Sequence, residues 1–288
     1  MMKMNNGSKK AFGIILFAVV SAGVLLGIVF RTMQLHYAID FSTGFYKEWH
    51  YSLPALDTVL LGAAVLVVLL SILLKRKPLY AVLPKRLGGS LLPFFCAAGL
   101  AAQTILQMVQ TTEWGIWLLV SSVLAAVSVV CFILLGLQQA LAKPGVSGYL
   151  FRNMVLTLWC CCQMLTVFFE RSSESNTSEF VFITLFLYAS TVFFIKYGKL
   201  TFYSQPDYHS SFSLLLSASF LSLFGFTLSV PNIILLCTGG ASPADFSPIA
   251  CAALPLAVYG FSFLFINCLS SPQKQEPAKS SASEAMEA

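Results

Sequence analysis

The polar stretch from Arg31 to His50 carries the densest set of side chains able to hold a ligand or an ion. It includes a guanidinium, a carboxylate and two imidazoles, supplied by Arg31, Asp40, His36 and His50. One interpretation is a ligand or ion site. The other is a folded surface loop in which Arg31 anchors the end of a helix. Two histidines and one aspartate without regular spacing are not a metal-binding pattern, so we predict neither a metal nor a cofactor.

The centre of this stretch has the chemistry of a turn. In Asp40-Phe-Ser-Thr-Gly44, the aspartate can accept hydrogen bonds from backbone N–H groups further along, and the glycine can adopt positive φ. The residues on either side alternate between apolar and polar types, which favours a short β-hairpin. We expect this hairpin to cap the outer mouth of the protein.

A second polar pattern lies between residues 91 and 110. Cys96, Gly99, Gln103, Gln107 and Gln110 fall within about 80° of one another at about 100° per helical residue. Amides need partners in hydrocarbon, so this face should point into a helix bundle. It is either the wall of a solute or lipid cavity or a set of interhelical hydrogen bonds with small-residue packing. A weaker version recurs at Ser219, Ser222 and Ser229.

Two further polar residues lie inside apolar segments. Asp57 is about one helical turn inside the second segment, where a charge is costly unless it is paired or close to the interface. We predict that it pairs with Arg31. Trp159 is near the middle of the fifth segment, and its indole N–H needs an acceptor. Gln163 is one turn away on the same helical face.

The elements that must position these residues are apolar segments. The chain has 288 residues, of which 57% are hydrophobic and only 10% charged, whereas a soluble domain has about 25% charged residues. Eight segments have roughly the twenty residues needed to cross a bilayer. We therefore predict an all-α, polytopic transmembrane helix bundle, with spans at 11–30, 53–74, 91–110, 115–138, 149–169, 180–196, 211–236 and 248–269.

The chain divides into three parts on this basis. Residues 1–10 form a short basic N-terminus, residues 11–269 form the membrane domain, and residues 270–288 form a tail rich in Pro, Ser, Lys and Glu that we expect to be disordered. The outer loop occupies residues 32–52. The first span is longer than the apolar region of a cleaved signal peptide, so we expect it to be retained as an anchor.

The distribution of basic residues orients the chain. Three basic residues, Arg31, Lys47 and Arg171, lie on one side of the predicted spans. Fourteen lie on the side of the two termini: Lys3, Lys9, Lys10, Lys75, Arg76, Lys77, Lys85, Arg86, Lys143, Arg152, Lys196, Lys199, Lys274 and Lys279. Cytoplasmic loops carry such an excess. Both termini should therefore be cytoplasmic, in a plasma-membrane protein.

The remaining chemistry of the sequence is sparse. Six of the eight cysteines fall inside apolar spans, where a free thiol behaves as a small hydrophobic group. No phosphate-binding, zinc-protease or serine-hydrolase motif is present. The basic residues form no clustered face with aromatic platforms, so nucleic acid is not an expected partner.

The first outer loop resembles a pattern in uncharacterised multi-pass membrane proteins of Gram-positive anaerobes. The shared features are an arginine at Arg31 followed by Asp-x-x-Thr-Gly-Phe, here Asp40 to Phe45. The resemblance covers about twenty residues. It implies a multi-pass membrane protein and carries no activity or site role.

Together these patterns favour a non-enzymatic membrane protein. It would be a permease-like bundle that binds a small solute or lipid, or a subunit of a membrane complex with a membrane-protein partner. The alternative is a membrane sensor whose outer loop detects a ligand, and the third candidate is an intramembrane enzyme. The sequence offers no nucleophile–base pair for an enzyme. For each of these candidates, membrane lipids are the expected surroundings of the protein.

Overall fold

The structure of the protein is a computed structural model, and it confirms an all-α bundle. It describes residues 6–39, 50–75, 79, 87–111, 115–140, 149–171, 177–202, 210–239 and 246–269. These residues include eight helices that are long and apolar enough to cross a membrane. The chain is therefore a multi-pass membrane protein, in which helices satisfy the backbone polar groups internally.

The helices follow the predicted spans closely. A five-residue π-helical segment, η1 (Gln34–Ala38), extends the first helix. The eight α-helices are α1 (Asn6–Met33), α2 (Ser52–Leu73), α3 (Leu87–Gln110), α4 (Ile116–Ala140), α5 (Tyr149–Arg171), α6 (Thr177–Phe202), α7 (Ser210–Cys237) and α8 (Ile249–Leu269).

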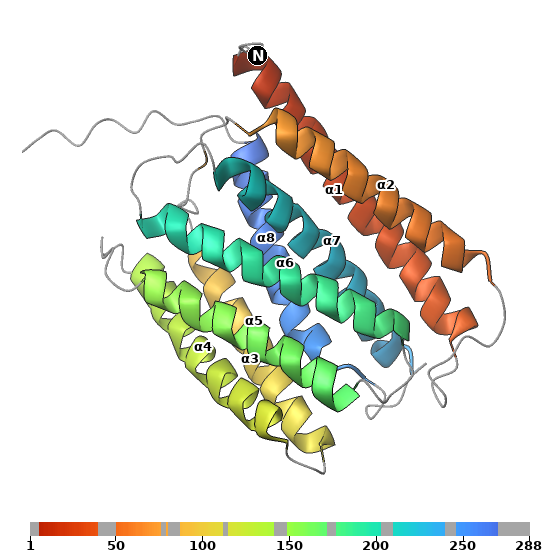
Figure 1. Cartoon of the computed structure of the whole chain (residues 1–288), viewed down its shortest axis with the longest axis vertical. Helices are drawn as coiled ribbons and strands as arrows, with labels where there is room; N and C mark the ends of the chain where they lie inside the picture. Colours follow the sequence, from red (N-terminus) through yellow and green to blue (C-terminus); the bar gives the residue numbers. More distant parts are fainter. Residues whose placement is uncertain are drawn as a thin grey trace, which may run out of the picture.

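Helices α3 to α8 form a closed ring. Each packs against the next, and α8 returns to pack against α3. The antiparallel pair α1 and α2 lies outside this ring against α7, and α1 also contacts α8 (Figure 1). In the most apolar stretch of each helix, 61% of the residues of α8 and 56% of those of α7 are buried, against 28% in α2. The pair α7 and α8 is thus the centre of the protein, and α2 is at its edge.

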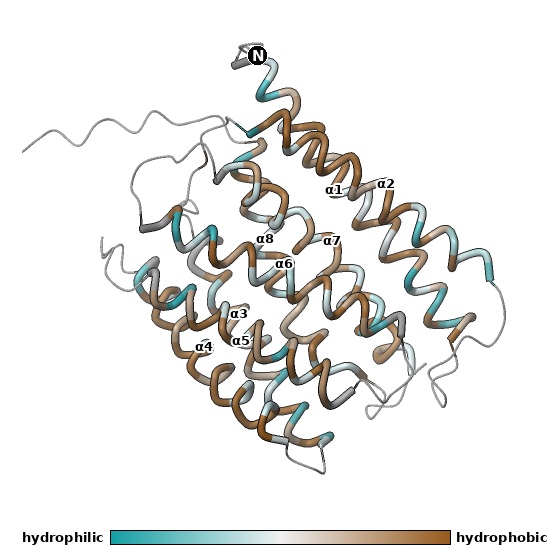
Figure 2. Tube along the Cα trace, viewed as in Figure 1, coloured by the Kyte–Doolittle hydropathy of each residue, from teal (hydrophilic) through white to brown (hydrophobic). Residues whose placement is uncertain are grey.

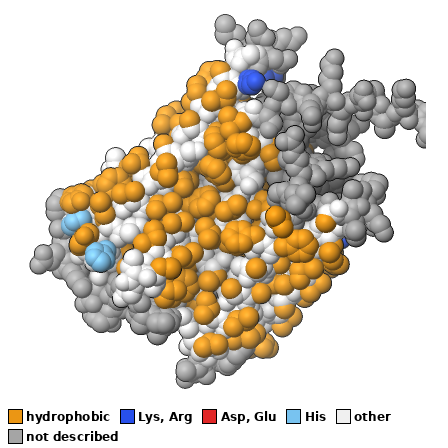
Figure 3. Space-filling model, turned by 180° about the vertical axis from the view of Figure 1, so that it is seen from behind, with side chains coloured by type: hydrophobic (Ala, Val, Ile, Leu, Met, Phe, Trp, Pro, Cys, Tyr) orange, Lys and Arg blue, Asp and Glu red, His pale blue; other side chains and the backbone are white. Residues whose placement is uncertain are grey.

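Polar residues are concentrated at the two ends of the helices, and apolar residues occupy the length between them (Figure 2). Seen from behind, the surface is a broad apolar area with basic side chains at one end and histidines at the other (Figure 3). We call the first the basic end; there α1, α3, α5 and α7 begin. Its described charged residues are all basic, namely Lys9, Lys10, Lys75, Arg152, Lys196 and Lys199.

Small residues bring the backbones of the central helices together. Pro255 has no N–H to donate to the carbonyl of Cys251 four residues earlier. Gly99 of α3 packs against this place: a Cβ at position 99 would lie 2.5 Å from that carbonyl oxygen and 2.3 Å from Pro255 Cγ. On the other side of α8, a Cβ at Gly225 of α7 would lie 2.7 Å from Ala257 Cβ. Neither Gly99 nor Gly225 can therefore be replaced by a larger residue without moving α8.

The structure corrects the boundary of the first span and the proposed hairpin. Arg31 and His36 are in helical backbone, because α1 continues to Met33 and η1 to Ala38. The expected extended strand is therefore wrong for residues 36–38. A helical turn is favoured here because it buries Leu35, which forms a small apolar cluster with Ile39 and with Leu235 of α7. The rest of the hairpin, residues 40–49, lies outside the described residues.

We predict opposite effects for two alanine substitutions. Gly99→Ala should destabilise the protein by about 1–3 kcal/mol, since the added methyl overlaps α8. Gly62→Ala is the matched control: Gly62 is an exposed residue of α2 with no atom within 4 Å of an added Cβ. It should raise stability by up to about 1 kcal/mol through better helix propensity. Unfolding in mixed micelles measures both, and equal effects at the two positions would contradict the close packing of α3 on α8.

Candidate functional site

Arg31 is the centre of a polar network at the end opposite the basic end. Its side chain is fully buried. The Nη1 group donates to Gln34 Oε1 at 2.9 Å, and the guanidinium carbon lies 5.0 Å from the ring centre of Phe182 on α6. Gln34 in turn donates through Nε2 to the backbone oxygen of Ser52 at 3.4 Å. Arg31 thus connects α1 to α6 directly and to α2 through Gln34.

The predicted pairing of Arg31 with Asp57 is wrong. Asp57 is exposed on α2 whereas Arg31 is buried, and the described residues include no ion pair between them. The physical reason is that Gln34 and Phe182 provide the guanidinium with a polar and an aromatic contact inside the bundle. Asp57 lies near the start of α2, where its carboxylate can remain solvated.

Of the two candidate histidines, His50 joins the end of η1 to the start of α2, whereas His36 contacts its neighbour Tyr37. His50 Nδ1 is 2.8 Å from the Ser52 hydroxyl and accepts the Ser52 backbone N–H at 3.3 Å. Its ring stacks on Tyr37 with centroids 5.9 Å apart. His36 is exposed beside the same tyrosine. Asp40, the other member of this candidate site, lies outside the described residues together with the motif that it begins.

The polar stripe of α3 faces the interior of the bundle, as predicted, most clearly at its central residue. Gln103 is only 1% exposed, and Gln107 and Gln110 are half-buried. Both ends of the stripe bind α8 or the segment before it: Cys96 Sγ donates to the Pro255 oxygen at 3.5 Å, and Gln110 Nε2 donates to the Phe246 oxygen at 3.1 Å. At these two positions the stripe holds helices together.

The centre of the stripe is different. The Oε1 atom of Gln103 is buried and has no hydrogen-bond partner in the described part of the chain. The same holds for Gln163 Oε1 and Trp159 Nε1 on α5, although their residues are only 4% and 0% exposed. The predicted hydrogen bond between Trp159 and Gln163 is therefore not formed. Unpartnered buried groups of this kind are uncommon and call for an explanation.

The serines of α7 are satisfied by their own helix. Ser219, Ser222 and Ser229 each donate to the carbonyl four residues earlier, at 2.8, 2.8 and 2.6 Å. Such bonds leave no hydroxyl donor for a solute. The α7 serines thus resemble ordinary buried serines, and Gln103, Gln163 and Trp159 are set apart from them.

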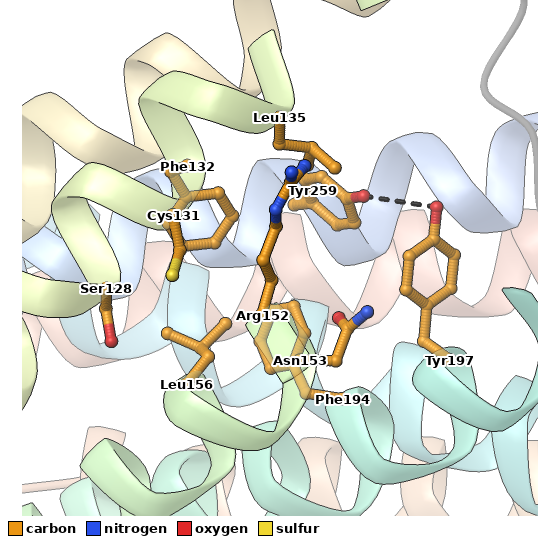
Figure 4. A pocket seen from close by; sticks show the side chains of 10 residues that line it. All are labelled: Ser128, Cys131, Phe132, Leu135, Arg152, Asn153, Leu156, Phe194, Tyr197 and Tyr259. Atoms are coloured by element: carbon orange, nitrogen blue, oxygen red, sulfur yellow. Dashed lines mark hydrogen bonds between the residues drawn. The ribbon is translucent and has the colours of Figure 1, made fainter. Parts of the chain in front are cut away.

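A pocket that the sequence did not predict lies near the basic end, between α4, α5, α6 and α8 (Figure 4). The volume of this cavity is about 20 Å³. Arg152, Asn153 and the hydroxyls of Tyr197 and Tyr259 are its main polar groups. In the sequence these residues lie on three segments that are far apart. The sequence indicates only that Arg152 is one of the basic residues on the side of the two termini.

In the part of the chain that the structure describes, metal ligands and disulfides add no further site. The described residues contain no group of three or more His, Cys, Asp or Glu side chains that could hold a metal ion. All eight cysteines are described, and none of them forms a disulfide, as predicted from their position in the spans. Cys160, Cys161 and Cys162 follow one another on α5, so their side chains point in different directions.

Comparison with known proteins gives no relative for this site. No family model matches the chain, and neither a curated protein nor a solved structure matches it significantly.

A double-mutant cycle tests the Arg31 network. Arg31→Met combined with Gln34→Leu should give a coupling free energy of about 1.5–3 kcal/mol, the scale of a hydrogen bond to a charged group. Arg31→Met combined with Asp57→Asn should give additive losses, since Asp57 is exposed and forms no ion pair with Arg31. Unfolding in mixed micelles provides both values. Coupling to Asp57 with none to Gln34 would mean that the guanidinium has a different partner.

Proposed function

We propose that this protein is a non-enzymatic, permease-like membrane protein that binds a small, neutral, polar solute inside its helix ring. The observation that carries the proposal is the presence of Gln103, Gln163 and Trp159 as large buried side chains with polar atoms that lack a partner in the described chain. These groups would line a single internal site between α3 and α5.

The positions of the two glutamines along their helices support one site. Gln103 is seven residues before the last residue of α3, and Gln163 is eight before the last residue of α5. At about 1.5 Å per residue, both are roughly 10–12 Å below the ends of their helices. Trp159 is one turn deeper on the same face of α5. Two amides and an indole N–H at neighbouring depths offer both acceptors and a donor to a solute.

The charge distribution favours a neutral solute. Helices α3, α4, α7 and α8 contain no Asp, Glu, Lys or Arg. An ion at this depth would have no opposite charge on these helices, and an uncompensated charge in a membrane interior is costly. A neutral molecule with hydroxyl, amide or urea groups would instead satisfy the amide oxygens and the indole N–H. Each such group costs about 1–3 kcal/mol when left without a partner.

The enclosed position favours a permease-like protein over a sensor. A solute between α3 and α5 must enter and leave by movement of helices, and proline interrupts the backbone hydrogen bonds of three of them. These prolines are Pro93 in α3, Pro231 in α7 and Pro255 in α8. Helices bend most readily at such positions.

Substitution of the central glutamine tests solute binding. Gln103→Leu should leave the melting temperature of the solute-free protein unchanged or higher, because it removes a buried acceptor without a partner. It should abolish the increase in melting temperature produced by the solute. The probes are glycerol, urea, a monosaccharide and a nucleoside, each at millimolar concentration, with acetate as the charged comparison.

Gln110→Leu is the matched control on the same stripe. It removes the hydrogen bond to the Phe246 oxygen, so it should lower stability by about 1 kcal/mol and leave the response to solute intact. Trp159→Phe should weaken that response while retaining aromatic packing. If no neutral probe shifts the wild-type protein, or if Gln103→Leu responds as fully as Gln110→Leu, the solute-binding function is rejected.

The orientation that we propose places the basic end, and with it both termini, in the cytoplasm of a plasma-membrane protein. The excess of Lys and Arg at the basic end supports this orientation, because cytoplasmic loops of membrane proteins carry such an excess. In a cysteine-free background, His36→Cys should react with an impermeant maleimide in intact cells, because His36 is exposed at the opposite end. Lys199→Cys, exposed at the basic end, should react only after permeabilisation. The reverse pattern would invert the topology.

A further inference from the structure

The pocket near the basic end combines a cation with apolar walls. Arg152 is the fourth residue of α5, so it lies in the first turn of that helix. In Figure 4 its side chain runs toward Leu135 and Tyr259, with Asn153 between it and Tyr197. Phe132, Leu156 and Phe194 form much of the remaining wall. None of the described residues that line the pocket is acidic.

Hydrogen bonds fix the polar groups around the pocket. Arg152 Nη1 donates to Gln138 Oε1 at 2.7 Å, which holds the guanidinium between α4 and α5. The Tyr259 hydroxyl donates to the Tyr197 hydroxyl at 3.2 Å, which joins α8 to α6. Arg152 and Asn153 are half-buried, whereas the two tyrosines are buried. Four helices thus hold a cation and several hydrogen-bonding groups at the mouth and floor of one small pocket.

The surroundings attract anions. The other described charged residues of the basic end are lysines, including Lys196 and Lys199 near the end of α6. The first turn of α5 also directs backbone N–H groups toward this end, which favours negative charge. Phosphate and carboxylate groups are the anions that a guanidinium binds best, because two N–H groups can reach two oxygens.

The size of the pocket restricts what can bind. The cavity volume of about 20 Å³ is close to the minimum that one water molecule needs. An oxygen of an anion fits this space, and an acyl chain does not. The bulk of the ligand must therefore remain outside, beside the half-buried Arg152.

We propose that Arg152 and Asn153 form a binding site for a phosphate group at the basic end, with one phosphate oxygen directed into the pocket. This site is separate from the proposed solute site between Gln103 and Gln163. Its phosphate has two sources, the headgroup of an anionic phospholipid and the free phosphate ion. Basic pockets between transmembrane helices at this level are suited to lipid headgroups.

Lipid titration of the full-length, delipidated protein in neutral detergent tests the site. The probes are dioleoylphosphatidylglycerol, dioleoylphosphatidylcholine and inorganic phosphate, and the readouts are the melting temperature and lipid retention in native mass spectrometry. The wild-type protein should retain phosphatidylglycerol in preference to phosphatidylcholine. Arg152→Gln should weaken phosphatidylglycerol binding about tenfold, the scale of a lost charge-assisted hydrogen bond, and abolish the preference.

Lys199→Gln is the matched control, because it removes one positive charge from an exposed residue of the same end that does not line the pocket. It should retain the preference. If Arg152→Gln does not fold, Asn153→Ala keeps the cation and should still weaken binding at least twofold. Equal losses in Lys199→Gln and Arg152→Gln would show a general charge effect and overturn the site.

The phosphate arm identifies the source. Stabilisation by phosphatidylglycerol alone, lost in Arg152→Gln, assigns the site to a lipid headgroup. Stabilisation by inorganic phosphate, also lost in Arg152→Gln, assigns the same site to the soluble ion. Absence of any Arg152-dependent effect with both probes rejects phosphate binding.

Discussion

The close packing of α8 between α3 and α7 is the constraint on which the rest of the bundle depends. Lipid tails are as apolar as leucine side chains, so helices in a membrane associate chiefly through van der Waals contact and hydrogen bonds. Close contact requires small residues where backbones cross. Gly99 supplies one at the α3 crossing, and Gly225 with Ala257 supplies the other at the α7 crossing. These crossings fix α8, and α8 closes the ring.

Closing the ring determines where side chains with polar atoms can lie. Serines on α7 occupy little volume and bind their own backbone, so they fit beside α8 without a partner on another helix. Gln103 and Gln163 have longer side chains, yet both residues are buried. The same enclosure that stabilises the bundle through packing therefore leaves two amide oxygens without a partner in the described chain. We infer that a solute satisfies them.

The fold was predictable because hydrophobic length is a strong signal. All eight segments were found within a few residues, and the largest differences are at the ends, where polar residues such as Lys199 and His36 continue the helix. The inward direction of Gln103 also followed from sequence, since an amide stripe cannot face hydrocarbon. Helical periodicity, however, gives only the direction in which a side chain leaves its helix. It could not show that Gln110 binds a carbonyl 136 residues away, whereas the side-chain oxygen of Gln103 has no partner in the described chain.

The contacts that Arg31 and Arg152 make with other helices could not be predicted from the sequence for the same reason. Asp57 is the natural partner for Arg31 when only charge and order along the chain are known. The structure instead places Gln34 and Phe182 around the guanidinium, which combines a neighbour in sequence with an aromatic ring on a distant helix. The pocket at Arg152 likewise needs four helices, and none of its segments carries a motif. Contacts between helices determine both sites, and spacing within one helix does not reveal them.

The central claim is that Gln103 and Gln163 contact a bound molecule within the ring. A high-resolution cryo-electron microscopy map of the protein, reconstituted in lipid nanodiscs with the solute that stabilises it most, tests this directly. The account predicts non-protein density within hydrogen-bonding distance of both amides, between α3 and α5. A map in which both amides are hydrogen-bonded to protein groups, with no such density between them, would contradict it.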